Sequence, residues 1–136
     1  MSGVPGGASA APSSDASLYG RDLNTWPRSW MGFEKDLPPG EHLLVCFRPF
    51  IAHLAASSLS PKTIRTHVDN LWMLGGEIIR NLNNDPALRK VPVDRLLRDL
   101  VHADGGPLLY HGTEDAQRSF DSTCRKLHRF LSQLQR

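Results

Sequence analysis

Basic side chains gather at two points of the chain where they could neutralise the phosphates of a nucleic acid. The first group follows Ser60-Pro61, and the second lies near the C-terminal end, where it includes one acidic residue, Asp121. The two groups contain Lys62 and Arg65, and Arg118, Arg125, Lys126, Arg129 and Arg136. A helix beginning at Ser60 would add free backbone N–H groups for one more phosphate. On charge alone a solvated helical face is the simpler interpretation, because helices commonly carry this much Lys and Arg.

Other side chains with catalytic or metal-binding chemistry are spread too widely to form a recognisable site. Cys46 and Cys124 belong to no C-x-x-C pair, and none of the six histidines has the H-x-x-x-H spacing of a zinc site. Both cysteines are therefore expected to be small buried hydrophobes. No nucleophile stands beside a base, and Asp94, Asp99 and His102 look like ordinary surface residues. We expect no enzymatic activity, no metal and no cofactor.

The composition is that of one ordinary globular domain. The chain has 136 residues, of which 40% are hydrophobic and 22% are charged. Its net charge of +2 and its pI of about 8.7 do not by themselves favour nucleic acid as a partner. No apolar run approaches the roughly 18 residues that cross a bilayer, and no basic segment followed by an apolar one marks the N-terminus. The protein is expected to be cytoplasmic, without membrane contact.

The sequence divides into three parts. Residues 1–17 are almost entirely Gly, Ala, Ser and Pro, which cannot bury enough apolar surface to offset their ordering entropy, so a disordered tail is predicted. Residues 18–40 show no sustained period and are predicted to be an extended arm. The aromatic anchors of this arm, which either cover edges of the core or bind a partner, are Trp26, Trp30 and Phe33. Residues 41–136 are predicted to form the helical domain.

Apolar residues repeat at helical spacing in four segments of that domain. They predict helices over residues 41–57, 61–81, 93–102 and 114–134. Ser60 is expected to cap the second of these helices and Thr113 the last. Pro49 either kinks the first helix or starts a new one, and Gly75-Gly76 indicates a close helix crossing or a hinge. Because no alternating β pattern is present, the chain is predicted to be an all-α bundle of four to five helices.

Three stretches of the domain resemble the core-binding domain of tyrosine recombinases, the family of phage integrases and their plasmid relatives. The run from Phe50 to Leu71, F-I-A-H-L-A-A-S-S-L-S-P-K-T-I-R-T-H-V-D-N-L, matches an F-x-x-x-L helix, a turn and an L-S-x-x-T-I-x-x-Y/H-x-x-x-L helix. The run from Cys124 to Leu131, C-R-K-L-H-R-F-L, is similar to the family's last core-binding helix, L-R-x-F-Y-x-F-L. Between them, V-P-V-D-R-L-L-R-D-L-V resembles the short intervening helix. The resemblance covers most of residues 41–131.

This resemblance implies a four-helix DNA clamp of the SAM-like type, with its second and last helices against the major groove and the flanking phosphates of double-stranded DNA. The implied DNA contacts are Lys62, Thr63, Arg65 and Thr66, and Arg125, Lys126 and Arg129. Among them Arg65 is the best candidate for a base edge. The chain departs from the family where a catalytic domain would follow, since five residues come after Leu131 and no histidine has an arginine three positions on. DNA cleavage is therefore not expected.

The sequence favours two possible functions. The leading one is a non-catalytic DNA-binding or recombination-accessory protein. The alternative is a small protein-interaction module, such as a mobile-element regulator or inhibitor, in which Trp26, Trp30, Phe33 and the loop at 103–112 bind a partner. Self-association is also open, because the face that a catalytic domain would cover is expected to be exposed. Salt separates the two functions, since phosphate contacts weaken steeply with salt and apolar contacts do not.

Overall fold

The computed structural model describes residues 23–134, and its named elements are all helices. In chain order they are the short 3-10 helix η3 (Leu23–Thr25), α1 (Trp26–Trp30), η4 (Glu34–Asp36), α2 (Leu37–Ala55), α3 (Pro61–Asn84), η5 (Pro86–Lys90), α4 (Val93–Leu100) and α5 (Glu114–Leu134). The prediction of an all-α bundle is therefore confirmed. The predicted disordered tail, residues 1–17, lies outside the described residues.

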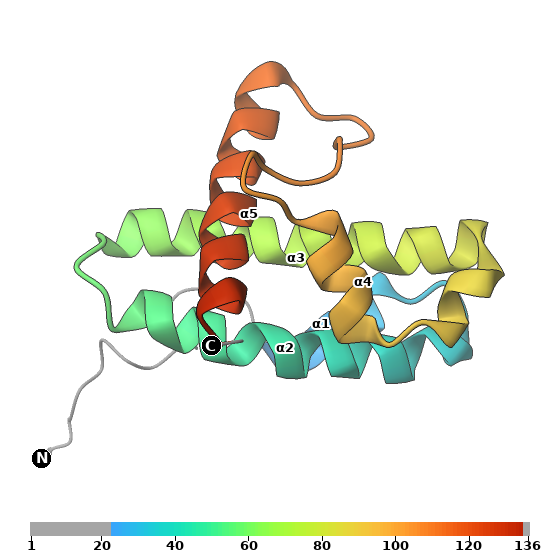
Figure 1. Ribbon diagram of the computed structural model, residues 1–136. Coiled ribbons are helices and arrows are strands. Elements are labelled where there is room, and N and C mark those ends of the chain that lie inside the picture. The colour runs from blue at the N-terminus through green and yellow to red at the C-terminus, as the bar shows by residue number, and fades with distance from the viewer. Residues whose placement is uncertain (1–22, 135–136) are drawn as a thin grey trace, which may run out of the picture.

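Helices α2 and α3 run antiparallel and form the pair on which the other helices pack (Figure 1). Helix α5 crosses this pair steeply and contacts α3, α4 packs on α2, and α1 covers the opposite side of the pair. The core between them is one continuous cluster of buried apolar side chains that includes Leu43, Phe47, Ile51, Val68, Leu71, Ile78, Phe120 and Leu127. Each such side chain stabilises the fold by roughly 1.5–3 kcal/mol when it leaves water.

Helices α3 and α5 begin where the capping residues predict. The Ser60 hydroxyl accepts a hydrogen bond from the backbone N–H of Thr63 at 3.2 Å, and the Thr113 hydroxyl accepts one from the N–H of Ala116 at 3.0 Å. These bonds satisfy amide groups that have no partner inside the helix. Helix α5 has the predicted bounds, whereas α3 runs three residues past the predicted end at 81.

Helix α2 begins earlier than predicted and continues through its internal proline. It starts at Leu37 and contains Pro38 and Pro39 in its first turn, where the missing N–H groups would have had no helical partner. The prediction of an extended arm over residues 18–40, which places these prolines before the helix, is therefore wrong for residues 37–40. Pro49 lies inside α2, so no new helix starts there.

The prediction of an extended arm is wrong for residues 23–36, which fold into η3, α1 and η4. Trp26 is only 1% exposed, and its ring packs edge-on against Trp30 and Phe47, with centroids 5.7 and 6.5 Å apart. Trp30 is half-buried and donates its Nε1–H to the carbonyl oxygen of Trp72 at 2.8 Å. The short helices form because the indole rings cover the α2–α3 pair, which is a long-range contact that local periodicity does not report.

The close approach predicted at Gly75-Gly76 exists, but it involves a side chain and not a helix backbone. A Cβ atom built on Gly75 would lie within 2.6 Å of the Cζ2, Cη2 and Cε2 atoms of Trp30. Real Cβ atoms essentially never come so near, so the indole ring needs a glycine at this position. At Gly76 the nearest ring atom is 3.5 Å away, which is an ordinary van der Waals contact.

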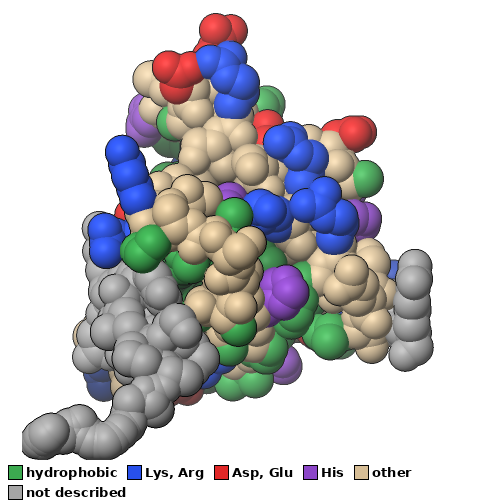
Figure 2. All heavy atoms as spheres, turned by 90° about the vertical axis from the view of Figure 1, so that its left-hand side faces the viewer, with side chains coloured by type: hydrophobic (Ala, Val, Ile, Leu, Met, Phe, Trp, Pro, Cys, Tyr) green, Lys and Arg blue, Asp and Glu red, His purple; other side chains and the backbone are tan. Residues whose placement is uncertain are grey.

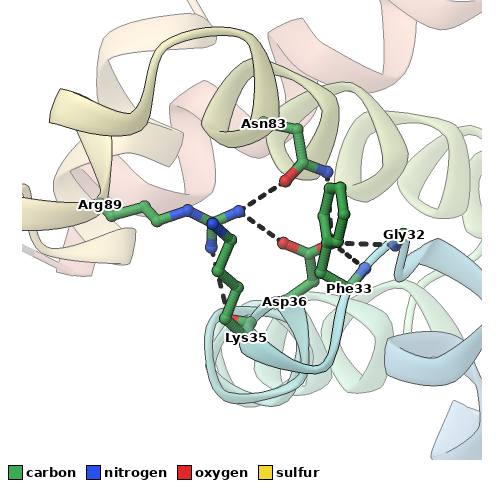
Figure 3. Close-up of polar contacts among 6 residues, drawn as sticks. All are labelled: Gly32, Phe33, Lys35, Asp36, Asn83 and Arg89. Carbon is green, nitrogen blue, oxygen red and sulfur yellow. Dashed lines mark hydrogen bonds and ion pairs between the residues drawn. The ribbon is translucent and has the colours of Figure 1, made fainter.

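Asp36 is a fully buried acid that joins three segments (Figure 3). Its Oδ2 accepts hydrogen bonds from the backbone N–H groups of Gly32 (2.8 Å) and Phe33 (3.0 Å) and from Asn83 Nδ2 (3.2 Å). Its Oδ1 accepts one from Arg89 Nη2 at 2.7 Å. Burial raises the pKa of this carboxyl, but Arg89 and the other donors outweigh burial and lower the pKa from 3.8 to about 2. The charged carboxylate therefore ties η4 to the end of α3 and to η5.

Candidate nucleic-acid interface

Basic residues of both groups lie towards the end of the molecule where α2 turns into α3 and α5 crosses them: Lys62 and Arg65 in the first turns of α3, and Lys126 and Arg129 of α5 across from the turn. Arg118 lies near the start of α5, and Arg136 lies outside the described residues. Figure 2 shows this end, with Lys and Arg side chains spread across it. Acidic side chains gather mainly at the upper edge of the view, where α5 begins with Glu114 and Asp115. The N-terminus of α3, capped by Ser60, opens onto the same end of the molecule. The partial positive charge of a helix N-terminus adds to the attraction for an anion.

A buried polar contact holds α5 in position against α3. His67 Nδ1 lies 2.6 Å from the Thr123 hydroxyl oxygen, and Asn70 Nδ2 donates to the same oxygen at 2.9 Å. Asn70 Nδ2 also donates to the carbonyl and hydroxyl oxygens of Ser119, each at 3.1 Å. Buried polar groups cost stability unless they are paired, so this set favours one alignment of the two helices. It therefore determines which basic residues of α5 lie beside α3.

His67 is uncharged at neutral pH in this arrangement. Burial lowers the pKa of the imidazole below 6.5, and the nearby positive charge of Lys126 lowers it further. The same interaction shows that Lys126 lies near the first half of α3. The basic surface therefore owes its charge to Lys and Arg, and His67 belongs to the packing beneath it.

The residues predicted on α3 are all exposed, but they point in different directions. Thr63 lies four residues before His67 and so shares the α5 side of the helix, and Thr66 lies about 100° round from His67. Arg65 lies two residues before His67, about 200° round, which places it on the opposite side of α3 from the α5 contact. Lys62 lies five residues before His67, about 140° round. The structure therefore brings neither Lys62 nor Arg65 to the side of α3 that α5 contacts.

The residues predicted on α5 divide in a similar way. Lys126 and Arg129 line a groove of about 280 Å³, whose other wall is the C-terminal end of α2 and the turn into α3. Arg125 points towards the segment after α4, where its Nη1 donates to the carbonyl oxygen of Asp104 at 3.3 Å. Lys126 and Arg129 thus face the α2–α3 turn, which leads into α3, whereas Arg125 is partly engaged elsewhere.

The α2 side of this groove was not predicted from the sequence as part of a site. His53, Ser57 and Ser58 line it, and the His53 ring packs on Phe130 with centroids 5.0 Å apart. The only sequence signal was the run of serines at the turn between two helices. The Ser57 hydroxyl already donates to the carbonyl oxygen of Leu54 at 2.6 Å, so the Ser58 hydroxyl and the His53 imidazole are the groups on this wall that can donate to phosphate oxygens beside Lys126 and Arg129.

The basic residues at this end differ in their ion pairing from those on the rest of the surface. Arg95 pairs with Asp99 and Arg98 with Asp94 along α4. Arg80 likewise pairs with Glu77, and Arg118 with Asp115. By contrast, Lys62, Arg65 and Arg129 form no ion pair with any residue in the range 23–134. No described residue neutralises their charge, which favours binding of an anion.

The aromatic residues predicted to bind a partner have three different environments. Trp26 is buried in the core and Trp30 is half-buried over Gly75, so these two rings cover the edge of the core. Phe33 is 58% exposed, with Lys35 Nζ 5.4 Å from its ring centroid. In the loop before α5, the side chains of Leu108 and Tyr110 are more exposed still, at 83% and 71%.

Cys124 is buried as predicted, and burial raises the pKa of its thiol to about 12, whereas Cys46 is only half-buried. Residues 23–134 contain no group of three or more His, Cys, Asp or Glu side chains that could hold a metal ion. None of the helices described has the length and apolar character needed to cross a membrane. Comparison of the chain with models of known protein families, with curated proteins and with solved structures finds no match.

Proposed function

We propose that this protein binds double-stranded DNA through the end of the molecule at which α3 begins and α5 crosses it. The observation that carries the proposal is the groove between the α2–α3 turn and α5, lined by Lys126 and Arg129, of which Arg129 forms no ion pair with a residue in the range 23–134. Basic side chains without internal partners release counterions when they neutralise phosphates, which is the main source of affinity in such complexes. The resemblance to integrase core-binding domains supports the same end of the molecule.

In this proposal a DNA backbone follows the groove. Lys126 and Arg129 contact phosphates from α5, and the α3 N-terminus with Thr63 and Thr66 contacts them from the other side. Arg65, on the far flank of α3, does not share this path and is assigned no base contact. The protein acts as a non-catalytic binding or recombination-accessory factor, because the basic side chains that line the groove are suited to hold phosphates.

The test is fluorescence anisotropy with labelled, mixed-sequence duplex DNA across a salt series. Lys126→Ala/Arg129→Ala is expected to weaken binding about tenfold or more at low salt. The plot of log K against log salt should also become shallower by about 1.8, because two phosphate contacts are lost. The matched control is Arg95→Ala/Arg98→Ala, which removes the same charge from α4, where both arginines are paired within their own helix.

Equal losses in the two double variants would mean that net charge alone attracts DNA, and the proposed groove would be rejected. Absence of binding by the unaltered chain even at low salt would reject DNA as the partner. Circular dichroism of each variant shows whether its fold is intact, and the exposed Arg129 is not expected to affect stability by more than about 0.5 kcal/mol.

A second candidate function, a protein-interaction module, is favoured by a separate apolar groove. This groove, of about 580 Å³, is lined by Trp30, Trp72, Met73, Leu109 and Tyr110. Aromatic and methionine side chains of this kind are enriched where proteins bind each other. Partner binding that persists at high salt, and that Tyr110→Ser removes while Lys126→Ala/Arg129→Ala does not, would favour this function over DNA binding.

A further inference from the structure

A further pocket, distinct from the two grooves described above, lies between the start of α2 and the segment that joins η5 to α4. Its volume is about 430 Å³, in the range of sites for small molecules. The floor and walls are apolar and include Pro39, Leu82, Val93 and Leu96. Neither the DNA-binding proposal nor the protein-interaction alternative uses this pocket.

The polar side chains around the pocket are all basic residues. Lys35, Arg89, Lys90 and His42 line it, and no acidic side chain does so in the part of the chain that the structure describes. Lys35 and Lys90 are exposed and form no ion pair with a described residue. An apolar cavity with a positive rim complements a ligand that carries a negative charge on an apolar body.

Arg89 has hydrogen-bond donors to spare. A guanidinium group has five N–H groups, and three of them donate here: Nη2 to Asp36 (2.7 Å) and to Asn83 (2.6 Å), and Nη1 to the carbonyl oxygen of Lys35 (3.3 Å). Figure 3 shows the guanidinium held among these groups. The remaining Nη1 hydrogen and the buried Nε–H have no acceptor among residues 23–134.

The network around Asp36 also holds Arg89 in place before any ligand arrives. The carboxylate is fully buried and accepts four hydrogen bonds, so it compensates the charge of Arg89 without lining the pocket itself. A side chain that is already ordered loses little conformational freedom on binding, which favours affinity. The two lysines supply the net positive charge that remains for a ligand.

From these features we infer a binding site for a small organic anion with an apolar body, meaning an alkyl carboxylate or an alkyl phosphate monoester. The anionic group lies among Lys35, Lys90 and Arg89, and it accepts hydrogen bonds from the lysine ammonium groups and the spare Nη1 hydrogen. The alkyl part lies against Leu82, Val93 and Leu96, which it covers from water. This inference is independent of the proposed function, because the two sites share no lining residue.

The experiment is a chemical-shift titration of the ¹⁵N-labelled full chain with four probes: hexanoate, hexyl phosphate, 1-hexanol and acetate. Hexanoate or hexyl phosphate is expected to bind at least about tenfold more tightly than 1-hexanol, which has no charge, and than acetate, which has almost no apolar body. The backbone signals that shift should be those of residues 35–42 and 89–96. Whichever of the two amphipathic anions binds more tightly identifies the headgroup.

Two double variants complete the test. Lys35→Gln/Lys90→Gln removes the two exposed charges of the rim and leaves the Asp36–Arg89 pair intact, and it is expected to weaken binding of the anions about tenfold. The matched control, Arg28→Gln/Arg48→Gln, removes two exposed charges that line neither this pocket nor the groove beside α5, and it should leave binding unchanged. No shifts with either amphipathic anion, equal binding of acetate or 1-hexanol, or full binding by Lys35→Gln/Lys90→Gln would each overturn the inference.

Discussion

Replacing Gly75 by alanine tests the packing of the N-terminal helices on α3. The added methyl group would lie within 2.6 Å of three atoms of the Trp30 ring, whose Nε1–H is bonded to the carbonyl oxygen of Trp72. The ring cannot remain where it is, so it must move away or α1 must shift from the α2–α3 pair. Forcing an extra methyl group into a packed site costs about 1–3 kcal/mol. If the indole bond is also lost, about 0.5–1.5 kcal/mol is added.

Helix propensity acts in the opposite direction. Alanine stabilises a helix interior relative to glycine by about 0.8–1.0 kcal/mol, because it loses less backbone entropy on folding. The net expectation for Gly75→Ala is therefore a destabilisation of about 0.5–3.5 kcal/mol if the indole bond is lost, and of about 0–2 kcal/mol if it is kept. Gly76→Ala is the matched control, since its new methyl group meets the ring only at 3.5 Å. This neighbouring substitution should stabilise the protein by up to about 1 kcal/mol.

The assay is urea unfolding followed by circular dichroism at the helical band, for the unaltered protein and both variants. The same two substitutions are then made in a Trp30→Ala background, where Gly75→Ala should become neutral or stabilising because the ring is gone. The reasoning would be refuted if Gly75→Ala were as stable as Gly76→Ala. It would also be refuted if the cost of Gly75→Ala were the same with and without Trp30.

Three further predictions concern titration and capping. Asp36 has a folded pKa of about 2, against 3.8 when exposed, so its carboxylate contributes about 2 kcal/mol to the free energy of unfolding. This contribution is present above pH 3.8 and is lost as pH falls towards 2. Urea unfolding at several acidic pH values should show the loss in the unaltered protein but not in Asp36→Asn. The pKa of His67 is lowered, so the folded state resists its protonation, and stability falls by at most about 1.4 kcal/mol per pH unit below pH 6.5. A ring signal assigned to His67 by its absence from the spectrum of His67→Gln would contradict this if it titrated at or above 6.5 in the folded protein. Ser60→Ala should cost about 1 kcal/mol of stability, because the hydrogen bond from the Thr63 N–H is lost. In the same thermal unfolding experiment, Ser58→Ala should change stability by less than about 0.5 kcal/mol. Equal effects of the two substitutions would mean that the Ser60 cap does not stabilise the helix.

Local sequence patterns predicted the long helices of this protein well. The period of apolar residues and the caps at Ser60 and Thr113 placed the start of α3 and both ends of α5, because a capped amphipathic helix is encoded within a few turns of chain. The same reasoning predicted the all-α class. It failed for residues 23–36, where α1 is one turn and a half long and forms because its tryptophans pack on distant helices.

The candidate site was predicted only in part. Lys62, Lys126 and Arg129 could be chosen from charge and resemblance, since basic side chains on a polar helix face are visible in the sequence. Which of them lie together depends on how α5 crosses α3. The hydrogen-bonding contacts of Thr123 with His67 and with Asn70 favour that crossing, and in each contact the two residues are more than fifty positions apart in the sequence. This is why Arg65 was grouped with residues that it does not face.

Local patterns of residues were enough to predict the all-α class, the start of α3 and both ends of α5, because caps and apolar periodicity act within one helix. Three features depend on tertiary packing: the contact of Trp30 with Gly75, the ion pair of Asp36 with Arg89 fifty-three residues away, and the cationic pocket that Arg89 lines. These features join segments far apart in the chain. Their energies depend on packing and burial, which no local pattern of residues records.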